Sequence, residues 1–461
     1  MGNTNSGEEW LEEVVMQLSP NVVQIIKDVL RKEVEPSIDE NMSEDGQKGG
    51  KFKFTKLDFG QEKPAWRNVS VHKSKEDGRR IVIDFDFVYN GDCDIEVRIL
   101  GATSGVSSIT MEGRARLILS PIIKRMPMVG GIQFQFLSLP AIGYQFDGIA
   151  DLADLPIVKT KIRKSLEKKI LKRIVYPNRA SIALTDRSDP LLIHTLPLTG
   201  LLRVNLSVED LPSKGGLRKV FKQGDPDVYC RIKFGACLEK VTSVVKNSNS
   251  ASWDEWFEFP VEIFKGHNLE IEVWDHDSAS RDDLLGRIVA KLDEESIAED
   301  SVNYNLEPHP FKKSKNDITG IVTLQTKFIA LSAEQTEEIT DGTFALLSVF
   351  IYKLNGVTEA SENSKLKVKI SIEEEIKKSK KISEEENFEV MERFTFLMGS
   401  DFMEKTLNLK VMDKKVASGE VLFEMGEILE CLGEKKDFAL DGGDNGESVS
   451  LIFNMKFGQN D

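Results

Sequence analysis

The sequence has no apolar run near the roughly 18 residues that a membrane-spanning helix needs, and no apolar segment typical of a signal peptide. Its five histidines do not cluster, and its cysteines show no metal-ligand spacing. It contains no nucleophile elbow, phosphate-binding loop or zinc-binding helix. We therefore expect neither an enzyme nor a nucleic-acid-binding protein. The cysteines are expected to be buried thiols in a reducing cytosol, and they are Cys93, Cys230, Cys237 and Cys431.

Acidic residues are concentrated in the last third of the chain. The 461 residues carry a net charge of −15, with 40% apolar and 30% charged residues, which is typical of globular domains. Residues 331–461 hold 16 basic and 27 acidic residues, so their net charge is −11. The acidity therefore does not argue against contact between the rest of the chain and an anionic membrane. The length allows about three domains of ordinary size.

Two predicted strands adjoin loops that carry carboxylates. Apolar residues alternate with glutamates over 269–273, which is the pattern of a half-buried strand, and a second strand is predicted over 228–234. Carboxylates gathered in flexible loops are the hard oxygen ligands that Ca²⁺ prefers. The alternative is that Asp282 and Asp283 are solvated turn residues and that Asp275 caps a strand. The candidate calcium ligands in these loops are Asp225, Asp275, Asp277 and Asp283.

The start of the chain combines a lipidation pattern with a predicted helix. Gly2 stands in the N-myristoylation pattern, although an unstructured start fits the same residues equally well. Apolar residues at helical spacing predict a helix over 8–35, either kinked at Pro20 or divided there into two. We expect this helix to end at Pro36 and a polar loop to follow over 39–50.

Residues 51–150 predict strands that are apolar on one side only. Such strands indicate a strongly curved antiparallel sheet whose apolar face must be covered by helices or by another apolar partner. Residues 156–175 predict a basic amphipathic helix with isoleucine and leucine along one face. We interpret it as a helix packed on the sheet with a solvated basic face, which is compatible with contact between the same lysines and a membrane.

Several blocks of the first 185 residues occur in the order of a known domain, among them 52–60, 89–95 and 176–179. This region resembles the synaptotagmin-like mitochondrial lipid-binding (SMP) domain of extended synaptotagmins and tricalbins. The resemblance implies a half-open tube of helix and curved sheet that dimerises end to end and carries glycerolipid acyl chains. An ordinary closed core is the alternative. Our candidates for the lining of the tube are Phe85, Phe87, Val97, Ile99, Leu117, Leu119, Phe134 and Phe136.

The carboxylate loops lie within a region, 195–330, that resembles a C2 domain. The resemblance rests on Gly-Asp-Pro-Asp-Val at 224–228, an altered form of the family's Ser-Asp-Pro-Tyr-Val, on the aromatic strand 252–259 and on the loop 275–286. It implies calcium binding at the four aspartates. The first loop, 211–223, lacks the family's usual acidic ligand, so we expect one Ca²⁺ held well or two held weakly. Candidate membrane contacts in that loop are Arg218, Lys219, Phe221 and Lys222.

The strand pattern resumes after an acidic linker and resembles a second, degenerate C2 domain. Its third loop keeps Asp413 but adds Lys414 and Lys415, so we expect no calcium there. The expected fold class is α+β, with an SMP-type tube of helices and curved antiparallel sheet followed by two all-β C2 sandwiches. The expected divisions are a leader at 1–7, an SMP-like domain at 8–186, a C2 domain at 195–330, a linker at 331–342 and a degenerate C2-like domain at 343–461.

The resemblance implies a lipid-transfer protein that carries glycerophospholipids between apposed membranes, with Ca²⁺-dependent docking of a C2 domain on anionic membrane. It also implies a homodimer formed through the SMP-like domain and a peripheral location on the cytoplasmic face of endoplasmic reticulum–plasma membrane contact sites. A calcium-regulated tether without lipid transfer is the alternative. The family's N-terminal membrane hairpin does not precede the first helix here. Either that anchor is absent, with acylation of Gly2 as its substitute, or the chain is truncated.

Overall fold

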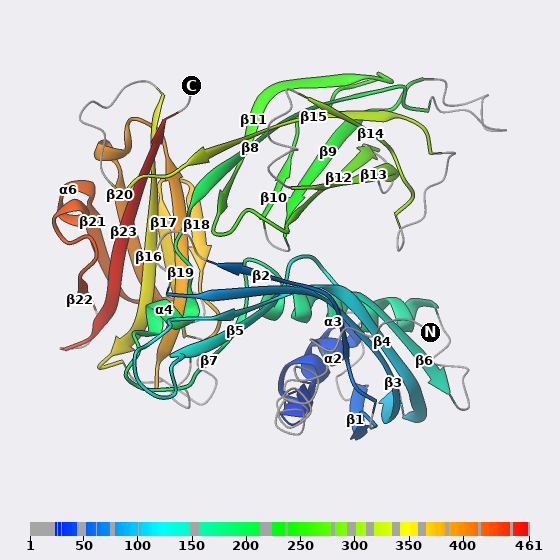
Figure 1. Cartoon of the computed structure of the whole chain (residues 1–461), viewed down its shortest axis with the longest axis horizontal. Coiled ribbons are helices and arrows are strands. Elements are labelled where there is room, and N and C mark those ends of the chain that lie inside the picture. The colour runs from blue at the N-terminus through cyan, green and yellow to red at the C-terminus, as the bar shows by residue number, and fades with distance from the viewer. Residues whose placement is uncertain are drawn as a thin grey trace. The chain divides into compact units, whose positions relative to one another are not determined.

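The computed structural model of the chain describes residues 24, 26–28, 30–43, 52–60, 62–73, 79–99, 101–147, 156–212, 224–235, 238–277, 282–292, 301–309, 318–333, 342–357, 366–382, 387–413, 416–442 and 446–459 (Figure 1). The leader and Gly2 lie outside these ranges. Among the described helices, none is both long enough and apolar enough to cross a bilayer. The chain forms two compact units. The first consists of Met1–Leu184, Leu206–Asp254 and Lys265–Leu324, and the second consists of Thr185–Asn205, Glu255–Phe264 and Gln325–Asp461.

One curved sheet of seven strands dominates the first region of the chain (Figure 1). The order is β1-β3-β4-β5-β7, with β2 paired to β3 and β6 paired to β4. Two long antiparallel strands, β3 and β4, form its centre because their apolar residues recur at period two. The strands are β1 (Phe52–Asp58), β2 (Ala65–Lys73), β3 (Ile81–Ile99), β4 (Ala102–Leu119), β5 (Gly131–Phe136), β6 (Ala141–Asp147) and β7 (Ala180–Ala183).

The N-terminal helix continues beyond the residue at which the sequence predicts its end. A π-helical turn, η1 (Leu30–Val34), is followed by α2 (Glu35–Ser43), so the predictions of a stop at Pro36 and of a loop from residue 39 are wrong. Pro36 is the second residue of α2, which begins directly after the π-helical turn. Proline has no N–H to donate, and the change from π-helix to α-helix at this point is where the regular hydrogen-bond ladder is interrupted. Most of the predicted helix 8–35 lies outside the described residues.

Helices cover part of the apolar face of the sheet. One buried cluster joins the helices to β3. It contains Val34 of η1, Ile38 of α2, Ile162 of α3 (Pro156–Ile174), and Val97 and Ile99 of β3. A second apolar cluster lies elsewhere on the same sheet, and it includes Ile170 and Ile174 near the end of α3 and the buried Val175 that follows the helix. The helix predicted over 156–175 is confirmed as α3.

The sheet also buries an ion pair between β3 and β4. Asp84 and Arg116 are paired in register, and both side chains are almost fully buried. Arg116 donates two hydrogen bonds to the Asp84 carboxylate, at 2.6 and 2.9 Å, and His72 Nε2 lies 2.9 Å from the same group. Burial alone would raise the pKa of Asp84, but the hydrogen bonds from Arg116 and His72 lower it well below its usual range. The carboxylate therefore stays ionised at neutral pH.

Replacing Arg116 by Met is expected to destabilise the protein by about 3–5 kcal/mol, because Asp84 would keep a buried charge without its main partner. The matched control is Arg114→Met, because Arg114 pairs with Asp86 in the next register position of the same face but both are only half-buried. Removing that pair is expected to cost no more than about 1 kcal/mol. Urea unfolding of both variants measures the difference, and equal destabilisation would contradict the prediction.

Two four-stranded antiparallel sheets follow, in the orders β10-β9-β12-β13 and β11-β8-β15-β14. Alternating buried residues on β9, β12 and β13 supply apolar side chains to the core. The two sheets confirm the all-β sandwich expected in this part of the chain. Their strands are β8 (Gly200–Glu209), β9 (Val228–Phe234), β10 (Leu238–Val241), β11 (Ala251–Val261), β12 (Asn268–Asp275), β13 (Asp283–Lys291), β14 (Val302–Asn305) and β15 (Ile321–Ala330).

A second sandwich occupies the last part of the chain, with sheets β19-β16-β23-β22 and β18-β17-β20-β21 (Figure 1). Its core is continuous and aromatic-rich, with Phe396, Phe402 and Phe453 fully buried. Short helices α4 (Pro190–His194) and α6 (Met425–Glu430) and a 3₁₀ turn, η3 (Phe402–Glu404), complete it. Its strands are β16 (Thr343–Asn355), β17 (Leu366–Ile372), β18 (Glu375–Lys378), β19 (Glu389–Met398), β20 (Thr406–Asp413), β21 (Val416–Glu424), β22 (Lys435–Ala439) and β23 (Ser448–Gln459).

Candidate functional site

The apolar face of the first sheet carries a cluster of aromatic residues. Trp66 and Phe85 lie with ring centroids 3.9 Å apart, and Phe136 lies 5.7 Å from Phe87 and 5.3 Å from Phe134. Phe85 and Phe136 are fully buried, whereas Phe87 and Phe134 are only partly buried. Partly exposed aromatic side chains beside a buried aromatic base are an apolar surface to which an acyl chain can bind.

The structure divides the candidate lining residues into two groups. Val97 and Ile99 are fully buried in the cluster that includes α2 and α3 residues. Leu119 is partly buried and pairs with Ile132 at the end of β4. The remaining five candidates share one cluster, which is the candidate lipid-binding face, and they are Phe85, Phe87, Leu117, Phe134 and Phe136.

Sequence reasoning left several members of this cluster out of the lining candidates. Among them are Trp66 of β2 and the α3 residues Ile170 and Ile174, which are packed against the same side chains. The signal for the isoleucines was present, because they continue the apolar stripe of α3 at intervals of four residues. Trp66 is the single aromatic residue of the nine-residue strand β2, whose apolar residues do not alternate regularly, so its sequence context gave no comparable signal.

Strand register brings the two carboxylate loops to the same end of one sheet. Asp275 is the last residue of β12, and it pairs with Val228 of β9 on one side and with Asp283 of β13 on the other. Asp225 lies three residues before Val228, and Asp277 lies two residues after Asp275. All four candidate ligands therefore stand near the same end of the sheet, although they come from two separate loops.

Asp227, which sequence reasoning left out of the ligand set, joins these loops. Its backbone N–H donates to Asp275 Oδ1 at 2.8 Å, and its carbonyl accepts the backbone N–H of His276 at 2.7 Å. Its carboxylate accepts the backbone N–H of Asn247 at 2.8 Å. The signal was the acidic residue that replaces tyrosine in the altered Gly-Asp-Pro-Asp-Val motif.

Asp282 organises the second loop rather than standing in solvent as an unstructured turn residue. Its carboxylate accepts hydrogen bonds from the Tyr229 hydroxyl at 2.7 Å and from the backbone N–H of Asp277 at 3.1 Å, and lies 3.1 Å from His276 Nδ1. Desolvation opposes ionisation, but these hydrogen bonds outweigh it and lower the pKa of Asp282. Burial and the bond to Asp282 raise the pKa of Tyr229.

The donor set of these loops fits calcium in chemistry, because every candidate ligand offers hard carboxylate oxygen. The four candidate aspartates do not form a tight cluster, however. Within the described residues, Glu270, Glu272 and His309 alone form a group of three or more such side chains whose ligand atoms all lie within 4.8 Å of one another. The assignment of calcium to the four aspartates therefore remains a prediction.

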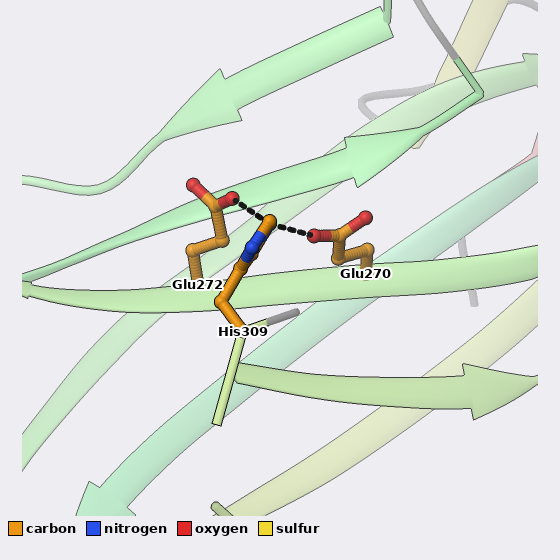
Figure 2. A group of neighbouring side chains, drawn as sticks. All are labelled: Glu270, Glu272 and His309. Carbon is orange, nitrogen blue, oxygen red and sulfur yellow. Dashed lines mark ion pairs between the residues drawn. The ribbon is translucent and has the colours of Figure 1, made fainter. Parts of the chain in front are cut away.

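Glu270, Glu272 and His309 form an ion-pair cluster on β12 and the chain after β14 (Figure 2). His309 Nε2 lies 3.7 Å from Glu270 Oε1 and 3.5 Å from Glu272 Oε1. Lys233 Nζ lies 2.7 Å from the same Glu272 oxygen, and Arg287 lies 3.6 Å from the Glu270 oxygen. Because two cations already neutralise the two carboxylates, we interpret this cluster as electrostatic support between neighbouring strands.

The remaining candidate residues can be placed only in part. The four membrane-contact candidates of the first loop lie within 213–223, outside the described residues. In the second sandwich, Asp413 ends β20 and pairs with Val416 of β21. This position corresponds to that of Asp275 in the first sandwich. The two lysines that follow Asp413 are also outside the described residues.

Comparisons with known proteins match the same regions. A family model described as the synaptotagmin-like mitochondrial-lipid-binding domain matches residues 4–185, and the C2 domain model matches residues 200–306 and 345–437. A solved structure of extended synaptotagmin 2, containing its SMP domain and two C2 domains, covers 98% of this chain with a TM-score of 0.66 and 24% identity. This chain in turn covers 99% of that structure, so the two share a fold.

Curated relatives give the same result at the level of sequence. Extended synaptotagmin-3 of Mus musculus is 26% identical over 97% of this chain, and the match spans 52% of the relative. Extended synaptotagmin-3 of Homo sapiens is 30% identical over 61% of this chain and 31% of the relative. Extended synaptotagmin-2 of Mus musculus is also 30% identical, over 62% of this chain and 33% of the relative. The chain thus spans about half or less of the length of these relatives.

The curved sheet, the sandwiches and the family matches together define an SMP–C2 protein, with one SMP region followed by C2 domains. More particularly, the chain is homologous to the extended synaptotagmins. The resemblance inferred from the sequence blocks is therefore confirmed, as is the α+β fold class. The matching families are lipid-binding and C2 families, and no catalytic family is among them.

Proposed function

We propose that this chain carries glycerophospholipids between apposed membranes and that its first C2 domain docks on anionic membrane when calcium is bound. The observation that carries the proposal is the apolar cluster of the SMP sheet, in which Phe87, Leu117 and Phe134 are only partly buried. An ordinary core would bury such large apolar side chains against one another. A bound acyl chain would complete their burial.

The energetics of extraction favour binding of an acyl chain to this face. Each buried CH₂ contributes about 0.8 kcal/mol, so a face that shelters an acyl chain recovers most of what that chain loses on leaving the bilayer. The face needs no polar contact along the acyl chain. The polar headgroup can remain at the open side, where water solvates it.

The first C2 domain supplies the proposed membrane contact. Asp225, Asp275, Asp277 and Asp283 would hold the ion, whose charge neutralises the loops and attracts lipid phosphate. Arg218, Lys219, Phe221 and Lys222 of the first loop are the proposed lipid contacts, at about 1 kcal/mol for each basic residue near an anionic surface. The described register supports this role, because both aspartate loops lie at one end of the sheet.

We further propose a homodimer formed through the SMP region and a peripheral location at contact sites between the endoplasmic reticulum and the plasma membrane. Both are what the resemblance to the extended synaptotagmins implies, and homology with that family supports them. The domain divisions inferred from the sequence belong to the same proposal. A myristoyl group at Gly2 would add a second membrane attachment, and one such chain alone binds a membrane only marginally.

Native mass spectrometry of the whole chain, purified from cells, tests the lipid-carrying function directly. The expected result is added mass that corresponds to bound glycerophospholipid, identified by extraction and tandem mass spectrometry. The same spectra show whether Gly2 is myristoylated. A folded chain that carries no lipid would favour the alternative function, a calcium-regulated tether whose apolar cluster is simply a core.

A further inference from the structure

The link between β4 and β5 is an ordered hairpin that projects from the SMP sheet, and we call residues 122–129 the SMP tip. Its base is closed by a bridge between Ile122 and Val129, and the Ile123 N–H donates to the Met128 carbonyl at 2.8 Å. Its end is a turn in which the Met128 N–H donates to the Arg125 carbonyl at 2.6 Å. These bonds fix which side chains stand at the end of the hairpin.

Large apolar side chains are exposed at this tip. Met126 is 83% exposed and Met128 is 58% exposed. Two more lie on the neighbouring strand β7 and just beyond it, Ile182 at 53% and Leu184 at 43%. The Leu184 N–H donates to the carbonyl of Gly130, so this end of β7 lies beside the base of the hairpin. Scattered exposed apolar residues are ordinary, but four in one corner of a sheet indicate a binding surface.

The tip is also basic in a chain that is acidic overall. Lys124 and Arg125 are exposed within the hairpin, and exposed Arg79 adjoins it because its carbonyl accepts the Ile122 N–H at 2.6 Å. From Gly113 to Phe146 the sequence contains no Asp or Glu, although the whole chain carries a net charge of −15. Apolar side chains surrounded by cations match an anionic lipid surface, whose headgroups attract the cations and whose interior takes the apolar groups.

The position of the tip connects it to the candidate lipid-binding face. Leu117 and Phe134 of that face pair in register, and the next pair on the same face of these strands is Leu119 with Ile132. Both residues of that pair are partly buried, and the hairpin begins directly after them. A row of apolar residues therefore runs from the aromatic cluster along β4 and β5 to the tip.

We propose that the SMP tip docks on an anionic membrane without calcium, inserting Met126 and Met128 below the headgroups while Lys124 and Arg125 contact them. This places one end of the candidate lipid-binding face next to the bilayer from which a lipid would leave. That last point rests on the proposed lipid-carrying function, whereas the docking itself does not. Methionine suits such insertion because its unbranched side chain adapts to irregular surroundings.

Flotation of the whole chain in EDTA, which removes the calcium-dependent contribution, tests the docking. The vesicles are phosphatidylcholine alone or phosphatidylcholine with phosphatidylserine. Binding to the anionic vesicles is expected to fall at least about tenfold for Met126→Asp/Met128→Asp, because two inserted apolar groups are lost. The matched control is Met403→Asp/Leu422→Asp, which changes two exposed apolar residues of the second sandwich and is expected to bind as the parent does.

A direct readout of insertion uses Met126→Trp, which adds a tryptophan at the tip to the five of the parent chain. The emission of the variant minus that of the parent is expected to shift to shorter wavelength with phosphatidylserine vesicles and to be quenched by brominated acyl chains. Lys124→Glu/Arg125→Glu is expected to abolish the preference for phosphatidylserine. The proposal is overturned if the parent does not bind anionic vesicles in EDTA, or if Met126→Asp/Met128→Asp binds them as well as the parent does. It is also overturned if that variant has a different oligomeric mass from the parent, because the tip would then be a contact between copies of the chain.

Lipid copurifying with Met126→Asp/Met128→Asp separates the two proposals. Because neither methionine belongs to the aromatic cluster, the variant is expected to retain as much bound lipid as the parent. A parent chain that docks through the tip but carries no lipid would remove the lipid-carrying function and leave the docking standing. A chain that carries lipid but does not dock in EDTA would remove the docking and leave the lipid-carrying function standing.

Discussion

Leu117→Asp is expected to reduce the lipid that copurifies with the chain at least about tenfold, which corresponds to about 1.4 kcal/mol of binding free energy. Leu117 lies on the candidate lipid-binding face between Ile83 of β3 and Phe134 of β5, and its side chain is only partly buried. A carboxylate there would have to be desolvated by a bound acyl chain, which costs free energy because the surrounding side chains are apolar. Quantitative lipid extraction from equal amounts of protein measures the effect.

Two controls separate lipid loss from unfolding. Leu117→Met keeps the apolar character and the volume, so it is expected to retain bound lipid with a stability change below about 1.5 kcal/mol. Leu422→Asp places the same charge on an exposed residue of β21 and is expected to change neither quantity. A folded Leu117→Asp variant that carries the parent's full complement of lipid would show that this face is not the lipid site.

Asp275→Asn/Asp277→Asn is expected to abolish the calcium-dependent part of vesicle binding. The double substitution removes two of the four candidate carboxylates, and calcium affinity follows the number of charged ligands. We expect calcium binding to weaken at least about tenfold, or about 1.4 kcal/mol. Asparagine keeps an oxygen that can accept the Asp227 N–H, so the bond between the loops is retained. Co-sedimentation with phosphatidylserine vesicles at increasing calcium concentration measures this loss.

The corresponding residue of the second C2 domain provides the control. Asp413→Asn changes the last residue of β20, which occupies the same place in its strand pair as Asp275 does in the first C2 domain. Because lysines follow Asp413 in the sequence, its substitution is expected to leave calcium-dependent binding unchanged. If Asp413→Asn removed the binding while the double variant kept it, the calcium role would belong to the second domain instead.

The predictions that succeeded concern patterns that are local in the sequence. Period-two alternation indicated the strands of the curved sheet, because successive side chains of a strand point to opposite faces. The same alternation ended at Asp275, where β12 ends. The prediction for Pro36 failed because proline usually ends a helix, whereas here the helix continues through Pro36 where the π-helical turn passes into α2.

The polar face of the curved sheet shows a second limit of sequence patterns. Gln133 and Gln135 alternate with the apolar residues of β5, which indicates that they lie on the opposite face, yet both are fully buried. Asp84 and Arg116 are buried as well. Alternation separates the two faces of a strand, but it does not show what packs on each face, since that depends on residues far away in the sequence.

By itself, the sequence determined the class of the fold and the order of the SMP and C2 regions, whose resemblance rests on short sequence blocks. It also identified the acidic residues of the candidate calcium loops. These depend on spacing between neighbours and on residue chemistry, both of which are local. Only the tertiary structure decided that Val97 and Ile99 lie in a buried cluster with residues of the helices, whereas Phe87, Leu117 and Phe134 remain partly exposed. All five are apolar strand residues with the same local pattern. Their difference arises from where α2 and α3 pack, which is a long-range property of the folded chain.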